Sequence, residues 1–132
     1  MSLFIDTSGF YALLVASESE HGAVRDAFRR AADGGRRLVT TNYVLLEPAA
    51  LLQHRIGLDP VRDLENRIAP VLSVKWVTPE LHARAVVRLF RTDKRRLSLV
   101  DVVSFVAMEE EGLNDALGLD SAFAAEGFRL LP

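Results

Sequence analysis

Short apolar stretches alternate with longer stretches of helical periodicity along this chain. The apolar stretches are short enough for each to be one buried strand. The sequence therefore predicts strands at residues 3–5, 37–41, 74–77, 116–119 and 128–131. Between them, apolar side chains recur at helical spacing, which predicts helices at residues 8–16, 20–32, 43–56, 60–72, 80–90 and 99–111.

Start signals support several of these helices. Asn42 precedes one of them, and the pair Thr78-Pro79 precedes another. Pro48 lies inside the predicted helix 43–56, so this helix is either kinked at Pro48 or begins later than residue 43. The alternation of strands and helices predicts an α/β fold, in which a mainly parallel sheet is covered by helices on both faces.

Length and composition limit the class of protein. The chain has 132 residues, of which 49% are hydrophobic, and we expect residues 1–132 to form a single domain. No apolar run reaches the roughly 18 residues that a membrane span needs, and the N-terminus does not resemble a secretory signal. We therefore expect a soluble, cytoplasmic protein with no membrane partner. The absence of cysteine excludes disulfides and thiolate metal sites.

Four carboxylates follow predicted strands or lie near the starts of predicted helices. Asp6 directly follows the first strand, and Asp120 directly follows the fourth. Glu47 and Asp101 lie near the starts of the third and sixth helices. Ligands of parallel sheets bind beyond the carboxyl ends of the strands, so we expect these four side chains to face one crevice.

Each of these carboxylates also has a structural interpretation, which the sequence leaves open. Asp6 and Asp120 can cap the helices that follow them, and Asp101 forms a Ser-x-x-Asp capping box with Ser98. Glu47 has no capping role, and its structural alternative is a buried pair with an arginine. The combination of the four residues, rather than any one of them, indicates a functional site.

Converging carboxylates indicate a metal site. Four of them in one crevice would repel one another unless a cation lay between them. An all-oxygen set selects hard divalent cations, so the sequence predicts Mg²⁺ or Mn²⁺. His21, His54 and His82 have no ligand-like spacing, and without cysteine this argues against zinc.

Four segments with these residues occur in a characteristic order over nearly the whole chain. They are LFIDTSGFYALL, VTTNYVLLEPAALL, LSLVDVVSFVAM and ALGLDSAFAAEGFRLL. With these four segments in this order, the chain resembles the PIN-domain family. Within that family it is most similar to the single-domain toxin ribonucleases of VapC type. The resemblance implies a three-layer α/β/α fold with a five-stranded, mainly parallel sheet. It also implies metal-dependent endonucleolytic cleavage of RNA.

The resemblance assigns roles to individual residues. Asp6 and Asp101 are expected to be direct ligands of one or two Mg²⁺ or Mn²⁺ ions. Glu47 would be a ligand or a general base, and Asp120 would bind through water or hold a second ion. Four further residues match positions that are usually polar in the family: Thr7, Ser8, Asn42 and Ser104.

Two positions leave open how the site is completed. Family members often have Thr or Ser two residues before the last aspartate, where this chain has Gly118, which puts strong binding of a second ion in question. Asp115 is a poor substitute because it lies at the other end of that predicted strand. Ser104 lies one turn from Asp101, so its hydroxyl either orients that carboxylate or bonds back to its own helix.

The net charge of −2 gives no overall attraction for RNA, which would need metal ions or a local basic patch. The densest basic cluster is RTDKRR, which leads directly into LSLVD. The following side chains are candidates for contacts with RNA phosphates, or else belong to a solvated loop: Arg91, Lys94, Arg95 and Arg96. Trp76, Tyr11 and Tyr43 lie on apolar segments and are expected in the core rather than under RNA bases.

The resemblance also implies partners: a homodimer, inhibited by a small antitoxin whose basic segment enters the acidic site. The alternatives are a housekeeping PIN nuclease without an antitoxin and a weak or inactive PIN-fold interaction module. A phosphoreceiver-type signalling domain would need an acidic pair after the first strand and a lysine after the last. The chain has Ile5 before Asp6 and no lysine beyond Lys94, and Ser8 stands where an aspartyl phosphatase needs a second aspartate.

Overall fold

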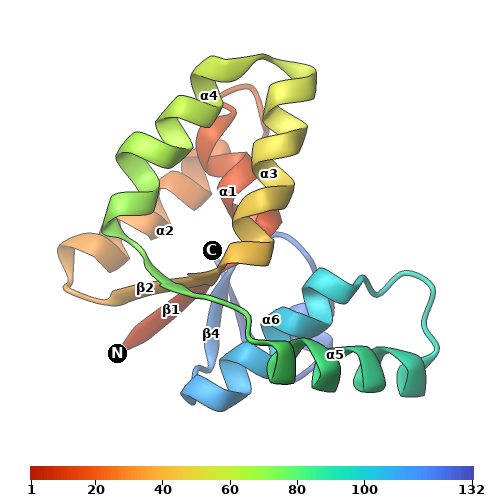
Figure 1. The fold of residues 1–132 in the computed structure, drawn as a ribbon. Coiled ribbons are helices and arrows are strands. Elements are labelled where there is room, and N and C mark those ends of the chain that lie inside the picture. Colours follow the sequence, from red (N-terminus) through yellow and green to blue (C-terminus); the bar gives the residue numbers. More distant parts are fainter.

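The computed structural model describes residues 1–132 and contains one five-stranded sheet with all its strands parallel (Figure 1). The strand order is β3-β2-β1-β4-β5. This confirms the predicted α/β class and the parallel sheet. The strands are β1 (Ser2–Ile5), β2 (Arg37–Thr41), β3 (Ser73–Lys75), β4 (Asp115–Leu117) and β5 (Arg129–Leu131).

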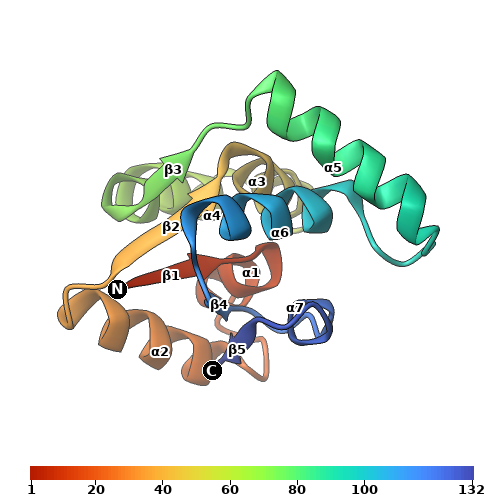
Figure 2. The ribbon, with the colours of Figure 1, turned by 90° about the horizontal axis from the view of Figure 1, so that it is seen from below.

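Helices connect the strands and cover both faces of the sheet. Helix α2 lies on the opposite side of the sheet from α5 and α6, as Figure 1 and Figure 2 show. None of the helices has the length and apolar character of a membrane span. They are α1 (Thr7–Leu14), α2 (His21–Asp33), α3 (Asn42–Arg55), α4 (Leu58–Asp63), α5 (Pro79–Thr92), α6 (Leu99–Glu111) and α7 (Ala122–Ala125).

Helix α3 begins at Asn42, one residue before its predicted start, and continues through Pro48. The Thr41 hydroxyl caps it by accepting a hydrogen bond from the Val44 N–H at 3.1 Å. The alternative of a later start is therefore wrong. Pro48 is buried, so the proline that interrupts the helical hydrogen bonding also contributes to packing.

The helix predicted at residues 60–72 is wrong in detail. Three shorter segments replace it: α4, a π-helical turn at Leu64–Ile68 and a 3₁₀ turn at Ala69–Val71. Pro70 lacks a backbone N–H, which limits the continuation of regular helix at this point. Two strands are also displaced: β3 ends at Lys75 and leaves Trp76 outside the sheet, and β4 ends at Leu117.

The strand order creates a switch point beside β1. The connection after β1 leads to β2 on one side of it, whereas β4 joins the sheet on its other side. Crevices for ligands form where neighbouring strands connect in opposite directions, beyond their carboxyl ends. A hydrogen bond of 3.1 Å from the Asp6 N–H to the Leu117 carbonyl joins the ends of β1 and β4 there.

Helix α6 is apolar around most of its circumference because it is buried on two sides. Phe105 and Met108 belong to the main core between the sheet and its helices. Val102, Val103 and Val106 belong to a second core against α5. The seven consecutive residues 102–108 are all buried. This packing anchors the helix whose first turn carries Asp101.

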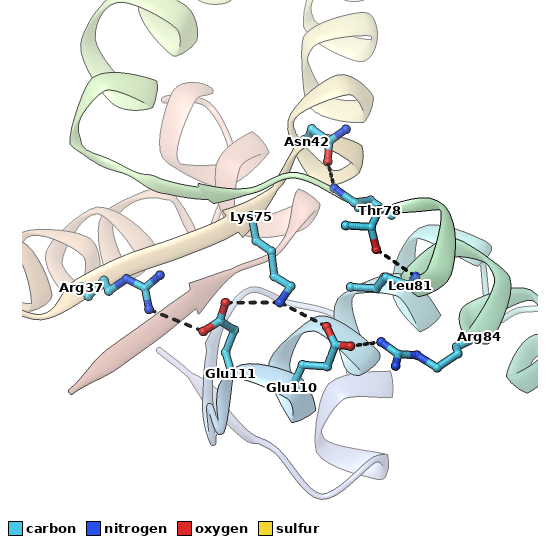
Figure 3. Close-up of polar contacts among 9 residues, drawn as sticks. Arg37, Asn42, Lys75, Thr78, Leu81, Arg84, Glu110 and Glu111 are labelled. Carbon is cyan, nitrogen blue, oxygen red and sulfur yellow. Dashed lines mark hydrogen bonds and ion pairs between the residues drawn. The ribbon is translucent and has the colours of Figure 1, made fainter.

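An alternating series of charges holds the other end of α6 (Figure 3). Lys75 Nζ lies 3.1 Å from a carboxylate oxygen of Glu110 and 3.3 Å from one of Glu111. Arg84 of α5 pairs with Glu110, and Arg37 of β2 pairs with Glu111 at 3.8 Å. Each such partly exposed pair contributes about 1 kcal/mol or less. Together they tie the C-terminal turn of α6 to β2, β3 and α5.

Candidate active site

A cavity of about 440 Å³ lies at the carboxyl edge of the sheet. All four carboxylates predicted from the sequence line it: Asp6, Glu47, Asp101 and Asp120. These residues come from segments up to 114 positions apart (120 minus 6), so the fold brings them together. The cavity is also lined by Thr7, Ser8, Tyr11, Ala12, Glu18, Leu51, Arg55, Ser98 and Leu119.

Asp6 is the most buried of the four carboxylates, with 2% of its surface exposed. It caps α1: Oδ1 accepts a hydrogen bond from the Thr7 N–H at 2.6 Å, and Oδ2 accepts one from the Ser8 hydroxyl at 2.8 Å. Burial raises the pKa of Asp6 to about 6, against the opposing effect of these hydrogen bonds. The negative charges of Asp101 and Asp120 add to the increase.

Asp101 forms the predicted capping box at the start of α6. Its N–H donates to the Ser98 hydroxyl at 3.1 Å, and its Oδ2 accepts from the Ser98 N–H at 3.3 Å. Burial raises its pKa, and the charges of Asp120 and Glu47 act in the same direction. Asp101 thus completes the capping box of α6 and also lines the cavity with the other carboxylates.

Glu47 and Asp120 are held more loosely. Asp120 is half-buried, and its Oδ1 accepts a hydrogen bond from the Ala122 N–H at 2.9 Å. Glu47 is exposed, and its one polar contact is a weak hydrogen bond of 3.5 Å from the Thr7 hydroxyl. The alternative of a buried pair between Glu47 and an arginine is wrong, because α3 turns this side chain toward the cavity.

The absence of a side chain at Gly118 has a structural reason. A Cβ atom there would lie 2.9 Å from Asp6 Oδ2 and 3.0 Å from Ser8 Oγ. The Ser8 hydroxyl, which donates to Asp6, also accepts a hydrogen bond from the Leu119 N–H at 2.8 Å. In this arrangement the hydroxyl next to Asp6 comes from α1, and no room is left for one at position 118.

Asn42 and Ser104 do not line the cavity. The Asn42 side chain accepts a hydrogen bond from the Val77 N–H at 2.8 Å, which fixes the segment after β3 to the start of α3 (Figure 3). Ser104 is buried, and its hydroxyl bonds back to the Val100 carbonyl at 2.9 Å. Both side chains therefore have structural partners, and the interpretation of Ser104 as a residue that orients Asp101 is wrong.

The predicted basic cluster lies outside the acidic cavity. Arg91, Lys94 and Arg95 line separate surface depressions at the end of α5 and in the loop after it. Arg96 lies two residues before Ser98, which does line the cavity. The cluster thus adjoins the site along the chain without forming part of its wall. Asp115, at the other end of β4, pairs with Arg36 at 2.9 Å.

The aromatic residues are distributed differently from the prediction. Trp76 is 71% exposed, because β3 is an edge strand that ends before it, so the expectation that Trp76 lies in the core is wrong. Tyr43 donates or accepts a hydrogen bond with His82 at 2.7 Å. Tyr11 lines the cavity beside Arg55.

Tyr11 and Arg55 are lining residues that the sequence interpretation missed. Tyr11 follows Thr7 by four residues, and Arg55 follows Glu47 by eight, so each shares a helix face with a predicted site residue. Helical spacing alone was the available signal. The contact between the two residues depends on the packing of α1 against α3, which spacing does not reveal.

The donor set fits a hard divalent cation in chemistry and in charge. It consists of carboxylate and hydroxyl oxygens, and burial, together with the neighbouring carboxylates, raises the pKa of Asp6 and of Asp101. A divalent cation with oxygen ligands would favour the ionised form of both. No group of three or more Asp, Glu or His side chains is already closed around a coordination position. Holding an ion would therefore require side-chain movement, for which the exposed Glu47 and half-buried Asp120 have room.

Comparison with known proteins identifies relatives that match this chain over nearly its full length. This chain is 35% identical over 127 residues to the 23S rRNA-specific endonuclease VapC20 of Mycobacterium tuberculosis. The alignment covers 96% of this chain and 95% of that protein. The same values hold for VapC20 of the strains CDC 1551 and H37Rv.

Two solved structures have folds similar to that of this chain. The crystal structure of Mycobacterium tuberculosis VapC20, described as a sarcin–ricin loop cleaving toxin, has a TM-score of 0.85 with 34% identity. The alignment covers 99% of this chain and all of that one. FitAcB from Neisseria gonorrhoeae has a TM-score of 0.69 over 98% of this chain and 96% of that one, and at 13% identity this likeness concerns the fold alone.

The family assignment follows from these comparisons and from the geometry of the site. The PIN domain model matches residues 3–126, which include all four cavity carboxylates. The sequence resemblance is thereby confirmed, and the chain belongs to the PIN domain family.

Proposed function

We propose that this chain is a divalent-metal-dependent endoribonuclease and the toxin of a toxin–antitoxin pair. The observation that carries the proposal is the convergence of Asp6, Glu47, Asp101 and Asp120 on one cavity at the switch point of the sheet. The similarity to proteins named as an rRNA endonuclease and a toxin supports it.

We assign most of the site residues as ligands of the metal ion and one of them as a proton acceptor. One or two Mg²⁺ or Mn²⁺ ions would stabilise charge on the phosphate and lower the pKa of a water molecule. Asp6 and Asp101 would hold the ion, each fixed by the hydrogen bonds of its helix cap. Asp120 would bind through water or hold a second ion.

Glu47 is suited to act as the general base. It is exposed at the cavity and bound by one weak hydrogen bond, so its carboxylate can take the proton of the attacking water. The water oxygen forms the new bond to phosphorus while the bond to the 3′ oxygen breaks. The products are a 5′-phosphate and a 3′-hydroxyl.

The substrate we propose is the sarcin–ricin loop of 23S rRNA. The relatives with 34–35% identity over nearly the full chain are named for cleaving this RNA. The basic residues Arg91, Lys94, Arg95 and Arg96 would contact phosphates of the RNA outside the cavity.

The partners we propose follow from the same similarity. A second copy of the chain would form a homodimer, and a small antitoxin protein would inhibit it by placing basic side chains in the acidic cavity. The expected location is the cytoplasm, where ribosomal RNA is made and assembled.

The test is cleavage of a hairpin RNA with the sarcin–ricin loop sequence. Wild-type protein is expected to cut it with Mg²⁺ or Mn²⁺ and not with EDTA. Asp101→Asn is expected to lower the rate at least about 100-fold because it weakens the hold on the ion. Asp59→Asn, a change at a side chain that is 94% exposed, serves as the control and should leave the rate unchanged.

Full activity of Asp101→Asn, or equal activity in EDTA, would contradict the proposed metal chemistry. Cleavage of unrelated RNAs at the same rate would instead contradict the substrate and favour a general nuclease.

A further inference from the structure

The cavity contains a single basic residue among its acidic ones. Glu18 lines it together with the four carboxylates of the candidate site, and Arg55 is the only Lys or Arg among the 13 lining residues. RNA carries a negative charge on every phosphate, and cationic side chains provide most of the affinity for phosphates that lie away from a metal ion. The surroundings of Arg55 therefore bear on how RNA is held.

Arg55 is held by an aromatic residue rather than by a carboxylate. Its Nη1 donates to the Tyr11 hydroxyl at 3.2 Å, and its guanidinium carbon lies 5.6 Å from the centre of the Tyr11 ring. No ion pair in the structure includes Arg55. A guanidinium has five N–H donors, so those not directed at Tyr11 can bind an oxyanion, in the bidentate geometry that arginine and phosphate favour.

The position of Arg55 on α3 indicates which phosphate it can reach. Glu47, Leu51 and Arg55 follow one another at intervals of four residues, and all three line the cavity. At 1.5 Å per residue, Arg55 lies about 12 Å from Glu47 along the helix axis. It therefore faces the stretch of RNA backbone beside the reaction centre rather than the bond to be cleaved.

We propose that Arg55 binds an RNA phosphate next to the scissile one and that Tyr11 positions its guanidinium. This rests on the proposed function, in that RNA is the substrate of the cavity. Fixing the side chain before RNA arrives lowers the entropy lost on binding. If the contact served only to join α1 to α3, removing it would change stability and leave RNA affinity unaltered.

The test measures binding of a fluorescein-labelled hairpin with the sarcin–ricin loop sequence by anisotropy in EDTA. Arg55→Met is expected to weaken binding about tenfold and to reduce the slope of log Kd against log salt by about one. Tyr11→Phe keeps the ring and loses the hydroxyl, so a loss of about twofold to threefold is expected. Arg55→Lys should retain part of the affinity.

The control is Arg29→Met, which removes the same charge from an exposed position of α2 outside the cavity. With Mg²⁺ present, Arg55→Met and Tyr11→Phe should raise KM while kcat stays within about twofold, because the contact is not at the reacting atoms.

Equal affinity, salt slope and KM for Arg55→Met and Arg29→Met would overturn this inference, even where the wild type cleaves the RNA. Absence of any binding of the hairpin by the wild type would overturn it as well. Binding with an Arg55-dependent salt slope, but no cleavage with any metal, would support the inference and refute the proposed nuclease function.

Discussion

Asp6 brings a negative charge into a buried position at the end of β1. Burial raises its pKa from 3.8 to about 6, although Ser8 and Thr7 donate hydrogen bonds to it. A shift of this size corresponds to about 3 kcal/mol by which the ionised carboxylate destabilises the metal-free fold. A bound cation would offset this cost, which is the energetic argument for a metal site at this position.

Asp6→Asn is expected to stabilise the metal-free protein. Because the folded-state pKa is above the unfolded value, the stability that Asp6 contributes is fully present below pH 3.8 and is lost as the pH rises through about 6. Asparagine does not ionise, so the gain in free energy of unfolding should be about 1 kcal/mol larger at pH 8 than at pH 5.

Urea unfolding in EDTA at the two pH values measures this difference. Asp59→Asn, on the exposed surface of α4, is the matched control and should show no such pH dependence. A lower stability of Asp6→Asn than of the wild type at pH 8 would refute the role given to burial.

The structural and the catalytic interpretation of each carboxylate could not be separated from the sequence alone. Asp6 is the N-cap of α1, Asp101 completes the capping box of α6, and Asp120 accepts a hydrogen bond from the Ala122 N–H at the start of α7. All three also line the cavity. A cap places a carboxylate at the start of a helix, and in this fold those starts lie at the carboxyl edge of the sheet. The capping role and the candidate catalytic role are therefore compatible.

At the scale of elements, the close approach of α1 to the end of β4 shapes the site. Gly9 allows it, because a Cβ there would lie 2.5 Å from the Leu117 carbonyl oxygen. Gly118, directly after β4, also allows this close approach, because a Cβ there would meet the side chains of Asp6 and Ser8. The two glycines let Asp6 lie beside the segment that leads to Asp120.

Gly118→Ser, which restores the hydroxyl common in the family, is expected to harm this protein. The added Cβ would displace the Asp6 carboxylate, with a loss of about 1 to 3 kcal/mol in stability from overpacking. RNA cleavage should fall at least about tenfold because a metal ligand moves. Melting curves and cleavage rates measure the two effects.

Gly22→Ser is the matched control, because the nearest atom to a Cβ at that position of α2 is 4.0 Å away. If Gly118→Ser were as stable and as active as Gly22→Ser, the close contact around Asp6 would not constrain the site.

The boundaries of helices and strands could be predicted where local sequence signals were strong. The predictions failed where packing between elements determines the boundary. The sequence places α6 correctly at residues 99–111, since its Ser98 cap and the αL residue Gly112 mark both ends. It does not place the break after α4, where π-helical and 3₁₀ turns replace regular helix. Side chains such as Asn42 and Ser104 could not be assigned, because their partners depend on how elements pack.

At the scale of the whole molecule, the order of strands determines where the chemistry can occur. With β1 in the middle and connections leading away on both sides, the ends of β1 and β4 meet at the switch point. The sequence predicted the four carboxylates that meet there. It missed Arg55 and Tyr11, because their contact depends on the packing of α1 against α3.

Calorimetric titration of the protein with Mn²⁺ tests whether the cavity binds a metal ion. The wild type should bind one or two ions, and Asp6→Asn and Asp101→Asn should each weaken binding at least about tenfold, whereas Asp59→Asn should not. Equal Mn²⁺ affinity in all four proteins, or no binding by the wild type, would contradict the assignment of the cavity as a metal-dependent active site.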